Sequence, residues 1–391
     1  MHDKHWLLPD GIDEILPPQT AVFEALRREL LDLFERWGYD LVLPPLVEYL
    51  DSLLTGVGGE LGLQTFKLTD QLTGRMLGIR ADITPQAARI DAHQMRREGP
   101  NRLCYIGNVL HTRADRLDGV RAPVQVGAEL YGHVGLEADL EILLLMLEAL
   151  SRAGINDIYL DLGHVGVFRG LARDAGLGRE QELALFDALQ RKAASDIAGL
   201  VQGFGLSAAQ QGWFTALAGL SGDQILPKAR EVLVDAGADT HKALGELERI
   251  AELLRRHRPN ISLHFDLAEL RGYHYHTGVV FAAFMPGRGQ EIARGGRYDD
   301  AGRAFGHARP ACGFSTDLKA LLKFGGFRGP PRSTVFAPWV EDPTLEGRVA
   351  ELRAKGVRVI YGLPEQQGDS RDMGCTEILE FIEGEWRLNP V

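Results

Sequence analysis

The sequence contains few cysteines, and their spacing suits neither disulfides nor a zinc site. Cys104, Cys312 and Cys375 lie far apart, and no Cys-x-x-Cys pair occurs. An odd number of isolated cysteines is typical of proteins that stay reduced, whereas small secreted domains carry cysteines in even numbers. The sequence therefore predicts a cytoplasmic protein without structural disulfides.

Long hydrophobic runs are also absent. The most apolar segment, residues 140–150, is interrupted by Glu141 and Glu148. A membrane-spanning helix needs about 20 consecutive apolar residues. Residues 1–6 lack the apolar stretch of a secretory signal. We therefore expect a core helix over residues 140–150 and no membrane association.

Positive charge is in deficit. The chain of 391 residues has 43 lysines and arginines against 54 aspartates and glutamates, which leaves a net charge of −11. A surface that binds nucleic acid needs excess positive charge to neutralise phosphates. The balance therefore favours a protein that does not bind nucleic acid. The 45% hydrophobic and 25% charged residues are typical of a globular protein.

Three widespread motifs of catalysis and cofactor binding are missing as well. The sequence has no Gly-x-x-x-x-Gly-Lys-[Ser/Thr] phosphate loop, no Gly-x-Gly-x-x-Gly dinucleotide loop and no Gly-x-Ser-x-Gly nucleophile turn. Cys104 and Cys312 lie within apolar runs, where an inert buried thiol is the usual finding. The sequence thus predicts no catalytic nucleophile and no bound cofactor.

Strand-like and helix-like segments alternate along the chain, and this predicts an α+β fold. Apolar residues recur at helical spacing over residues 22–37, and residues 39–47 are predicted as a strand that Pro44-Pro45 breaks, which confines these prolines to an edge or a strand end. Residues 65–80 are typical of a hairpin. Strand patterns also cover residues 103–110 and 124–131.

The arrangement of these segments predicts two parts. A block of helix-like sequence at about residues 166–260 interrupts the strands and is interpreted as an insertion. The glycine- and proline-rich residues 325–332 mark a boundary. We therefore expect a core of residues 1–325 that contains the helical insertion, followed by a small α/β appendage of residues 326–391.

The densest group of polar side chains lies in residues 270–281. If this stretch is extended, the imidazoles of His274 and His276 share one face of a strand and its two tyrosines share the other. An imidazole pair at this spacing suits a metal, with His264 and His307 as candidate further ligands. The same mixture of side chains equally suits the floor of a pocket for a small polar molecule.

A second polar group lies on the predicted strand 124–131, where Gln125, Gly127 and Glu129 share one face. Glycine in the middle of a strand favours a ligand that approaches closely. Asp82 precedes a predicted helix for which Thr84 is the expected N-cap. The Asp82 carboxylate therefore either serves the helix dipole or contacts a ligand.

These polar residues fit a single pocket together with Arg271 and Tyr275. Asp82 and Glu129 supply two carboxylates, and Arg271 supplies one guanidinium. Such a balance suits a zwitterion with additional polar or positive character. A pocket of this kind needs no metal.

Residues 7–322 resemble the catalytic core of class II aminoacyl-tRNA synthetases, specifically histidyl-tRNA synthetase. Residues 41–48 and 103–132 are similar to the first two class II motifs. Arg271-Gly-Tyr-His-Tyr-His-Thr-Gly278 resembles the histidine-specific Arg-Gly-Leu-Asp-Tyr-Tyr-Thr-Gly signature, and residues 295–299 resemble the segment before the third motif. The resemblance implies an antiparallel sheet flanked by helices and a dimer interface near residues 18–47.

The resemblance also implies a histidine-binding site without a metal. Each residue of this site is carried over from a matching motif position of the synthetase. The implied histidine-binding residues are Asp82, Thr84, Gln125, Glu129, Arg271, Tyr275 and His276.

The ATP side of the synthetase pattern is changed. His111 and Ala320 stand where the family has the arginines of its second and third motifs, and the tail is too short for a complete anticodon-binding domain. Removing one preorganised donor to transition-state charge costs on the order of 3 kcal/mol. The resemblance therefore predicts that the chain does not activate its amino acid.

A histidine pocket without this chemistry resembles the regulatory subunits of ATP phosphoribosyltransferase, which are paralogues of the synthetase. The resemblance implies a non-catalytic homodimer within a hetero-oligomer in the first step of histidine biosynthesis. Its expected partners are the short-form catalytic subunit, which it activates, and L-histidine, which inhibits through it. An active histidyl-tRNA synthetase and a histidine-binding module for another partner remain as alternatives.

Overall fold

The computed structural model describes the chain except for residues 1–5, 56–58, 115–118, 270–271, 274 and 332. The described residues form two compact units, Met1–Phe327 and Arg328–Val391. None of the helices described in either unit combines the length and the apolar character that crossing a membrane requires.

The first unit is built on a mixed sheet, which over the described residues has nine strands in the order β1-β5-β6-β12-β11-β10-β7-β9-β8. All neighbours from β5 to β7 in this order are antiparallel. The expected antiparallel sheet of an α+β fold is thereby confirmed. The strands are β1 (Asp40–Leu41), β5 (Asn101–Asn108), β6 (Val124–Tyr131), β7 (Tyr159–His164), β8 (Ser221–Gly222), β9 (Ser262–Asp266), β10 (Val279–Phe284), β11 (Glu291–Arg297) and β12 (Ala311–Asp317).

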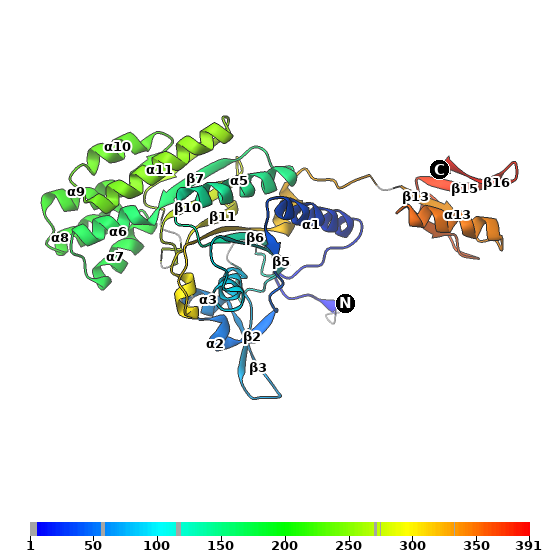
Figure 1. The fold of residues 1–391 in the computed structure, drawn as a ribbon, viewed down its shortest axis with the longest axis horizontal. Helices are drawn as coiled ribbons and strands as arrows, with labels where there is room; N and C mark the ends of the chain where they lie inside the picture. Colours follow the sequence, from blue (N-terminus) through cyan, green and yellow to red (C-terminus); the bar gives the residue numbers. More distant parts are fainter. Residues whose placement is uncertain (1–5, 56–58, 115–118, 270–271, 274, 332) are drawn as a thin grey trace. The chain divides into compact units, whose positions relative to one another are not determined.

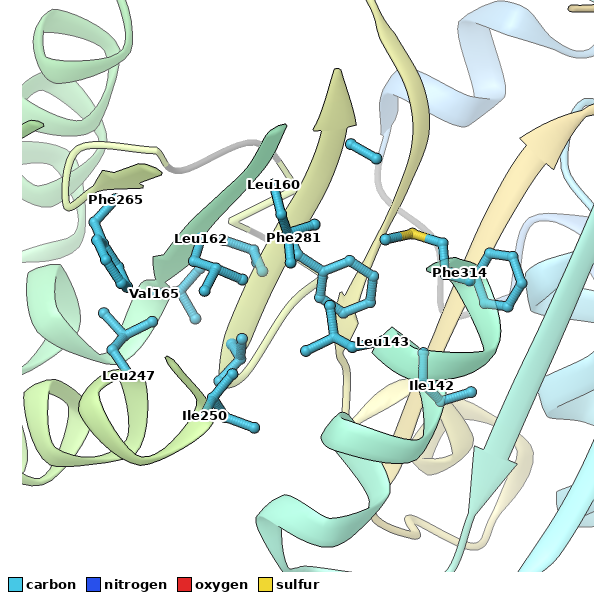
Figure 2. Packing of buried hydrophobic residues seen from close by; sticks show 14 of the residues in the cluster. Ile142, Leu143, Leu160, Leu162, Val165, Leu247, Ile250, Phe265, Phe281 and Phe314 are labelled. Atoms are coloured by element: carbon cyan, nitrogen blue, oxygen red, sulfur yellow. The ribbon is translucent and has the colours of Figure 1, made fainter. Parts of the chain in front are cut away.

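One face of this sheet is covered by α1 (Gln19–Arg36), α5 (Leu136–Arg152) and α12 (Leu318–Phe324), and the main core lies between them. Figure 2 shows Ile142 and Leu143 of α5 against Phe281 and Phe314 of the strands. Strand side chains alternate between faces. Glu129, next to the buried Ala128, therefore points to the opposite face.

The helical block predicted between the strands forms at one end of the sheet (Figure 1). Its longest helix, α11, carries seven buried residues along one face, including Leu247 and Ile250. The two-residue strand β8 interrupts the block, which the helix-like sequence pattern did not predict. The helices are α6 (Val165–Asp174), α7 (Arg179–Gln190), α8 (Ala194–Gly203), α9 (Ala208–Leu217), α10 (Ile225–Val232) and α11 (Ala238–His257).

The strand predicted over residues 39–47 is broken at Pro44-Pro45, as the sequence indicates. The structure has two strands there, β1 and β2 (Val47–Tyr49), which belong to different sheets. Pro44-Pro45 separates them because neither proline has an N–H to donate to a neighbouring strand. β2 joins the predicted hairpin, β3 (Phe66–Thr69) and β4 (Met76–Ile79), with the short helices α2 (Leu50–Leu53) and α3 (Gly59–Gln64) beside it in the chain.

The second unit has its own small core around Val335, Leu345, Val349 and Leu379. One helix packs against a sheet with the order β14-β13-β15-β16. Its strand-helix-strand start and its final hairpin follow the sequence pattern. The elements are β13 (Thr334–Ala337), α13 (Pro343–Ala354), β14 (Arg358–Tyr361), β15 (Glu377–Ile382) and β16 (Glu385–Pro390).

Candidate functional site

Three neighbouring strands leave room for one buried carboxyl group. Glu129 on β6 lies opposite Gly313 on β12, and Gly313 lies opposite Gly296 on β11. A Cβ atom added to Gly313 would come within 1.5 Å of Glu129 Oε2. The glycine at this register position is therefore what allows the Glu129 side chain to lie across the sheet.

Two tyrosine hydroxyls hold the Glu129 carboxyl, which is only 1% exposed. Tyr105 donates a hydrogen bond of 2.8 Å to Oε1, and Tyr298 donates to Oε2. Burial raises the pKa of Glu129 to about 8, although both tyrosine hydrogen bonds oppose the increase. The Glu129 carboxyl group therefore titrates near neutral pH.

Gly127 has a different role from the predicted one. A Cβ atom at this position would come within 2.4 Å of the Tyr105 hydroxyl, which lies opposite it on β5. The group that approaches the glycine is thus a tyrosine of the same chain. The sequence reasoning missed both Tyr105 and Tyr298, although a tyrosine facing a strand glycine would have been a usable signal.

Asp82 serves both the helix start and the site. Its Oδ1 accepts two hydrogen bonds, one of 3.0 Å from the N–H of Thr84 and one of 2.7 Å from Nε2 of Gln125. Gln125 Oε1 in turn accepts a hydrogen bond of 2.9 Å from the N–H of Ile83. These bonds fasten the start of α4 (Thr84–Arg89) to strand β6.

The expected N-cap role of Thr84 is wrong. Ile83 occupies the N-cap position, and Thr84 is the first residue of α4. Because the Asp82 carboxylate already accepts from the first turn, the Thr84 hydroxyl is directed to Tyr105 Oη at 3.0 Å. A continuous chain of hydrogen bonds therefore joins Thr84, Tyr105 and Glu129.

Tyr275 completes this polar cluster. Its ring stacks on Tyr298 with a centroid distance of 4.8 Å and an interplanar angle of 24°. Its hydroxyl is buried, and within the described part of the chain it makes no hydrogen bond. Burial, together with the charges of Glu129 and Asp82, raises the pKa of this hydroxyl well above its usual value. Buried hydroxyls normally have a partner, so a bound polar group would satisfy this one.

Over its described residues, the stretch that holds Tyr275 is a turn, and not the extended strand that the sequence analysis considered. Gly272 has φ +68°, and its carbonyl accepts from the N–H groups of Tyr275 at 2.7 Å and His276 at 2.8 Å. The turn sends Tyr273 away from the site, into the helical block beside Phe168. Strand β10 begins only at Val279.

His276 closes the site from this turn. Its Nδ1 lies 3.3 Å from the Arg297 carbonyl, and a Cβ atom on Gly296 would come within 2.8 Å of its ring. Burial lowers the pKa of His276 to about 4, so the imidazole is neutral at pH 7. Arg271 and His274, the other predicted members of this stretch, lie outside the described residues.

The metal alternative gains no support from the residues that the structure describes. Among them, histidine, cysteine, aspartate and glutamate form no group of three suited to an ion. His264, one of the proposed further ligands, is hydrogen-bonded to Asp161 and Ser221 on other strands. His276 contacts a backbone carbonyl, as described above.

A buried ion pair positions Tyr298. Arg297, which precedes it, donates to Asp139 of α5 with an Nη2–Oδ2 distance of 2.8 Å. The same guanidinium donates to the carbonyls of His133 and Gly135. The end of β11 is thereby fixed to the start of α5, which holds the Tyr298 hydroxyl at Glu129.

The two positions that depart from the synthetase pattern have local structural roles. His111 Nε2 lies 2.9 Å from the Ala81 carbonyl, and the His111 carbonyl accepts from Arg121 Nε at 3.1 Å. Ala320 is 6% exposed and packs into the core within α12. Neither side chain carries the guanidinium group that the resemblance associates with these positions.

Two family models match the chain in succession. The model described as "Histidyl-tRNA synthetase" matches residues 11–321. The model described as "ATP phosphoribosyltransferase subunit HisZ C-terminal domain" matches residues 332–389. The first model covers the large sheet and the helical block, and the second covers the small unit.

Solved structures share this fold. A protein from Bacillus halodurans, described as an ATP phosphoribosyltransferase regulatory subunit/histidyl-tRNA synthetase, has a TM-score of 0.82 and 26% identity, over 96% of this chain and 97% of that one. A histidyl-tRNA synthetase from Nostoc sp. has a TM-score of 0.77 over 99% and 97% of the two chains, at 20% identity. The Nostoc protein shows similarity of fold alone.

Curated relatives match over nearly the whole length. The ATP phosphoribosyltransferase regulatory subunit of Thioalkalivibrio sulfidiphilus is 56% identical over 379 residues, which is 96% of each chain. That of Nitrosococcus oceani is 52% identical over 386 residues, 98% of this chain and 97% of the relative. The chain therefore belongs to the family of ATP phosphoribosyltransferase regulatory subunits, the non-catalytic subunits of that enzyme complex, which have a histidyl-tRNA synthetase-like fold.

Proposed function

We propose that this regulatory subunit binds L-histidine in the Glu129 cluster, activates the short-form catalytic subunit and transmits feedback inhibition to it. It acts in the cytoplasm in the first step of histidine biosynthesis. It forms a homodimer through the region of residues 18–47 within a larger hetero-oligomer, and it contacts neither nucleic acid nor membrane. No residue of the chain takes part in phosphoribosyl transfer itself.

The observation that carries this proposal is the buried Tyr275 hydroxyl, which makes no hydrogen bond to any residue that the structure describes, beside the side chains of Asp82 and Glu129. Leaving a polar group buried and unpaired costs about 1–3 kcal/mol. A ligand that supplies a donor or acceptor at this point recovers that free energy. The imidazole and amino groups of histidine carry such atoms.

Each residue of the proposed site has a distinct task. Asp82 and Gln125, which are already bonded to each other, receive the amino end of histidine. Thr84 and Tyr105 hold the Glu129 carboxyl in place. Tyr275 and His276 close over the imidazole, and we assign Arg271, from outside the described residues, to the same site.

Calorimetric titration with histidine tests the site directly. Changing Glu129→Gln keeps the side-chain shape but removes the charge that the carboxyl group gains when a cationic ligand displaces its proton, and Tyr275→Phe removes only the hydroxyl. Hydrogen bonds to charged groups contribute about 1.5–3 kcal/mol. We therefore expect the Glu129→Gln variant to bind histidine about 10- to 100-fold more weakly. The exposed Glu98→Gln serves as the matched control and should bind like the unchanged chain.

The same variants separate histidine sensing from assembly. In a mixture with the short-form catalytic subunit, Glu129→Gln should still form the complex and raise phosphoribosyl transfer, but histidine should inhibit it far less. Inhibition at the original histidine concentration would contradict the proposed site. Absence of both association and activation with the unchanged chain would instead favour a histidine-binding module for another partner.

The alternative function, an active histidyl-tRNA synthetase, can be tested by a simple assay. The occupants of the two changed positions, His111 and Ala320, lack the guanidinium groups that the synthetase pattern has there. We expect the purified chain to show no histidine-dependent exchange of pyrophosphate into ATP. Robust exchange would refute the non-catalytic interpretation.

A further inference from the structure

A second polar site lies on the same sheet at its other edge. A cavity of about 480 Å³ opens there over β7, β9 and β10, lined by Tyr159, Asp161, Asp223, Ser262, Leu263, His264 and Phe284. In the strand order, β12, β11 and β10 separate β6, which carries Glu129, from β7. The cavity is therefore distinct from the proposed histidine site.

Both sites lie on the face of the sheet that α5 leaves uncovered. Residues directly opposite each other on neighbouring strands share a face. The register Glu129, Gly313, Gly296, Val280, Gly163 crosses from β6 to β7. Asp161, two residues before Gly163, points to the same side.

A chain of hydrogen bonds at this cavity joins a serine, a histidine and an aspartate. His264 Nδ1 lies 2.9 Å from Asp161 Oδ1, its register partner on β7. His264 Nε2 lies 3.2 Å from Ser221 Oγ on β8. A carboxylate only accepts hydrogen bonds, so Nδ1 donates to Asp161 and the Nε2 lone pair faces the Ser221 hydroxyl.

The burial of these groups orients the imidazole. The Asp161 side chain is 13% exposed and that of His264 is 32% exposed. Burial raises the pKa of Asp161, and the hydrogen bond from His264 opposes that increase. A half-buried carboxylate that holds Nδ1 fixes the ring orientation and stabilises the imidazolium that forms when Nε2 takes a proton.

Ser221 is only partly buried, and open space adjoins the residue that follows it. Gly222 follows Ser221 with φ +143°, and a Cβ atom on it would have no neighbour within 4 Å. One wall of the cavity is flat and apolar because the rings of Tyr159 and Phe284 stack at 5.3 Å with an angle of 8°. Asp223 adds a carboxylate to the lining. This lining suits small neutral or cationic esters and disfavours anionic ones.

We propose that Ser221, His264 and Asp161 form a nucleophilic site that takes the acyl group from a small ester, an activity separate from regulation of the phosphoribosyltransferase. The Ser221 oxygen attacks the carbonyl carbon while its proton passes to His264 Nε2. The ester C–O bond then breaks, and the alcohol leaves with that proton. Water attacks the acyl-serine, and its proton passes through His264 to Ser221 as the carboxylic acid departs.

Hydrolysis of p-nitrophenyl acetate by the full-length chain tests this activity. General-base catalysis contributes about 10²- to 10⁴-fold to a rate. We expect Ser221→Ala and His264→Gln each to lower the rate by about 100-fold or more. The remaining rate should be the background that exposed histidines of any protein give. Ser195→Ala, an exposed serine of α8 whose hydroxyl contacts Asp196, is the matched control. Equal rates for Ser221→Ala and this control would overturn the proposal.

Covalent labelling of the unchanged chain gives a readout that does not depend on how a variant folds. A fluorophosphonate reacts with an activated serine by forming an O–P bond and releasing fluoride. We expect peptide mapping to place the label on Ser221, and saturating histidine to leave the labelling rate unaltered. Failure to label, or a label on another residue, would show that Ser221 is not activated. Neither outcome bears on histidine binding, which calorimetry measures separately.

Discussion

At the scale of single residues, Glu129 combines a carboxyl group with nearly complete burial. Its neighbours Tyr105 and Tyr298 donate hydrogen bonds that favour the charged form, but burial outweighs them and raises the pKa to about 8. The cluster therefore holds a proton at pH 7 that the unfolded chain has already released. A cationic ligand would displace that proton, so ligand binding and protonation of Glu129 are linked.

This linkage predicts how stability depends on pH. Between the unfolded pKa of about 4.5 and the folded pKa of about 8, the native state binds more protons at Glu129 than the unfolded state does. The free energy of unfolding should therefore fall as the pH rises through this range, with a contribution of at most about 1.4 kcal/mol per pH unit. Urea unfolding at pH 5, 6, 7 and 8 measures it.

The Glu129→Gln variant isolates the contribution, because glutamine does not titrate. We expect its free energy of unfolding to depend less steeply on pH than that of the unchanged chain. Identical slopes for the two proteins would mean that the Glu129 carboxyl stays charged in the native state.

At the scale of elements, the turn around Gly272 joins the site to the helical block. Tyr275 stacks in the Glu129 cluster, whereas Tyr273 packs on Phe168 of α6 and donates a hydrogen bond to Glu182 of α7. Arg169 of α6 donates a hydrogen bond of 2.6 Å to the Tyr273 carbonyl. The ordering of the turn is therefore coupled to the packing of α6 and α7.

A substitution at Tyr273 tests that coupling. Replacing a buried aromatic residue by alanine costs about 3–5 kcal/mol, so Tyr273→Ala should destabilise the block by about that amount. Hydrogen exchange should then increase in α6 and α7 more than in α1. Tyr273→Phe keeps the ring contacts and loses only the bond to Glu182, so an effect of about 1 kcal/mol is expected. Equal exchange in the two variants and the unchanged chain would show that the turn does not support the helices.

At the scale of the whole molecule, the described residues contain separate cores. The main core extends from Leu26 to Leu321, and the small one lies between Val335 and Leu379. Independent folding of the predicted core and appendage stays a prediction. It has physical support in these separate cores and in the glycine- and proline-rich residues between them.

Truncation after Phe327 examines this organisation. Because Glu129, Tyr275 and their partners all lie in the first unit, we expect the shortened chain to unfold cooperatively and to bind histidine with unchanged affinity. Calorimetry and a thermal melt by circular dichroism measure both properties. A shortened chain that aggregates or loses histidine binding would show that the first unit depends on the second.

Local sequence patterns were sufficient for much of the fold. The buried stripe Leu26, Leu30 and Leu33 predicts α1, and alternation predicts β6, because these periods depend only on residues close together in the chain. Local patterns did not show that the strands on either side of Pro44-Pro45 join different sheets, or that the left-handed Gly272 turns the backbone.

The sequence by itself determined the order of elements, the acidic character and the set of residues shared with the synthetase pattern. Only the tertiary structure decided what surrounds them. Tyr298 and Glu129 are 169 positions apart, and His264 and Asp161 are 103 apart. Such contacts form because strand register brings distant residues together, and register follows from packing of the whole sheet, which no local pattern contains.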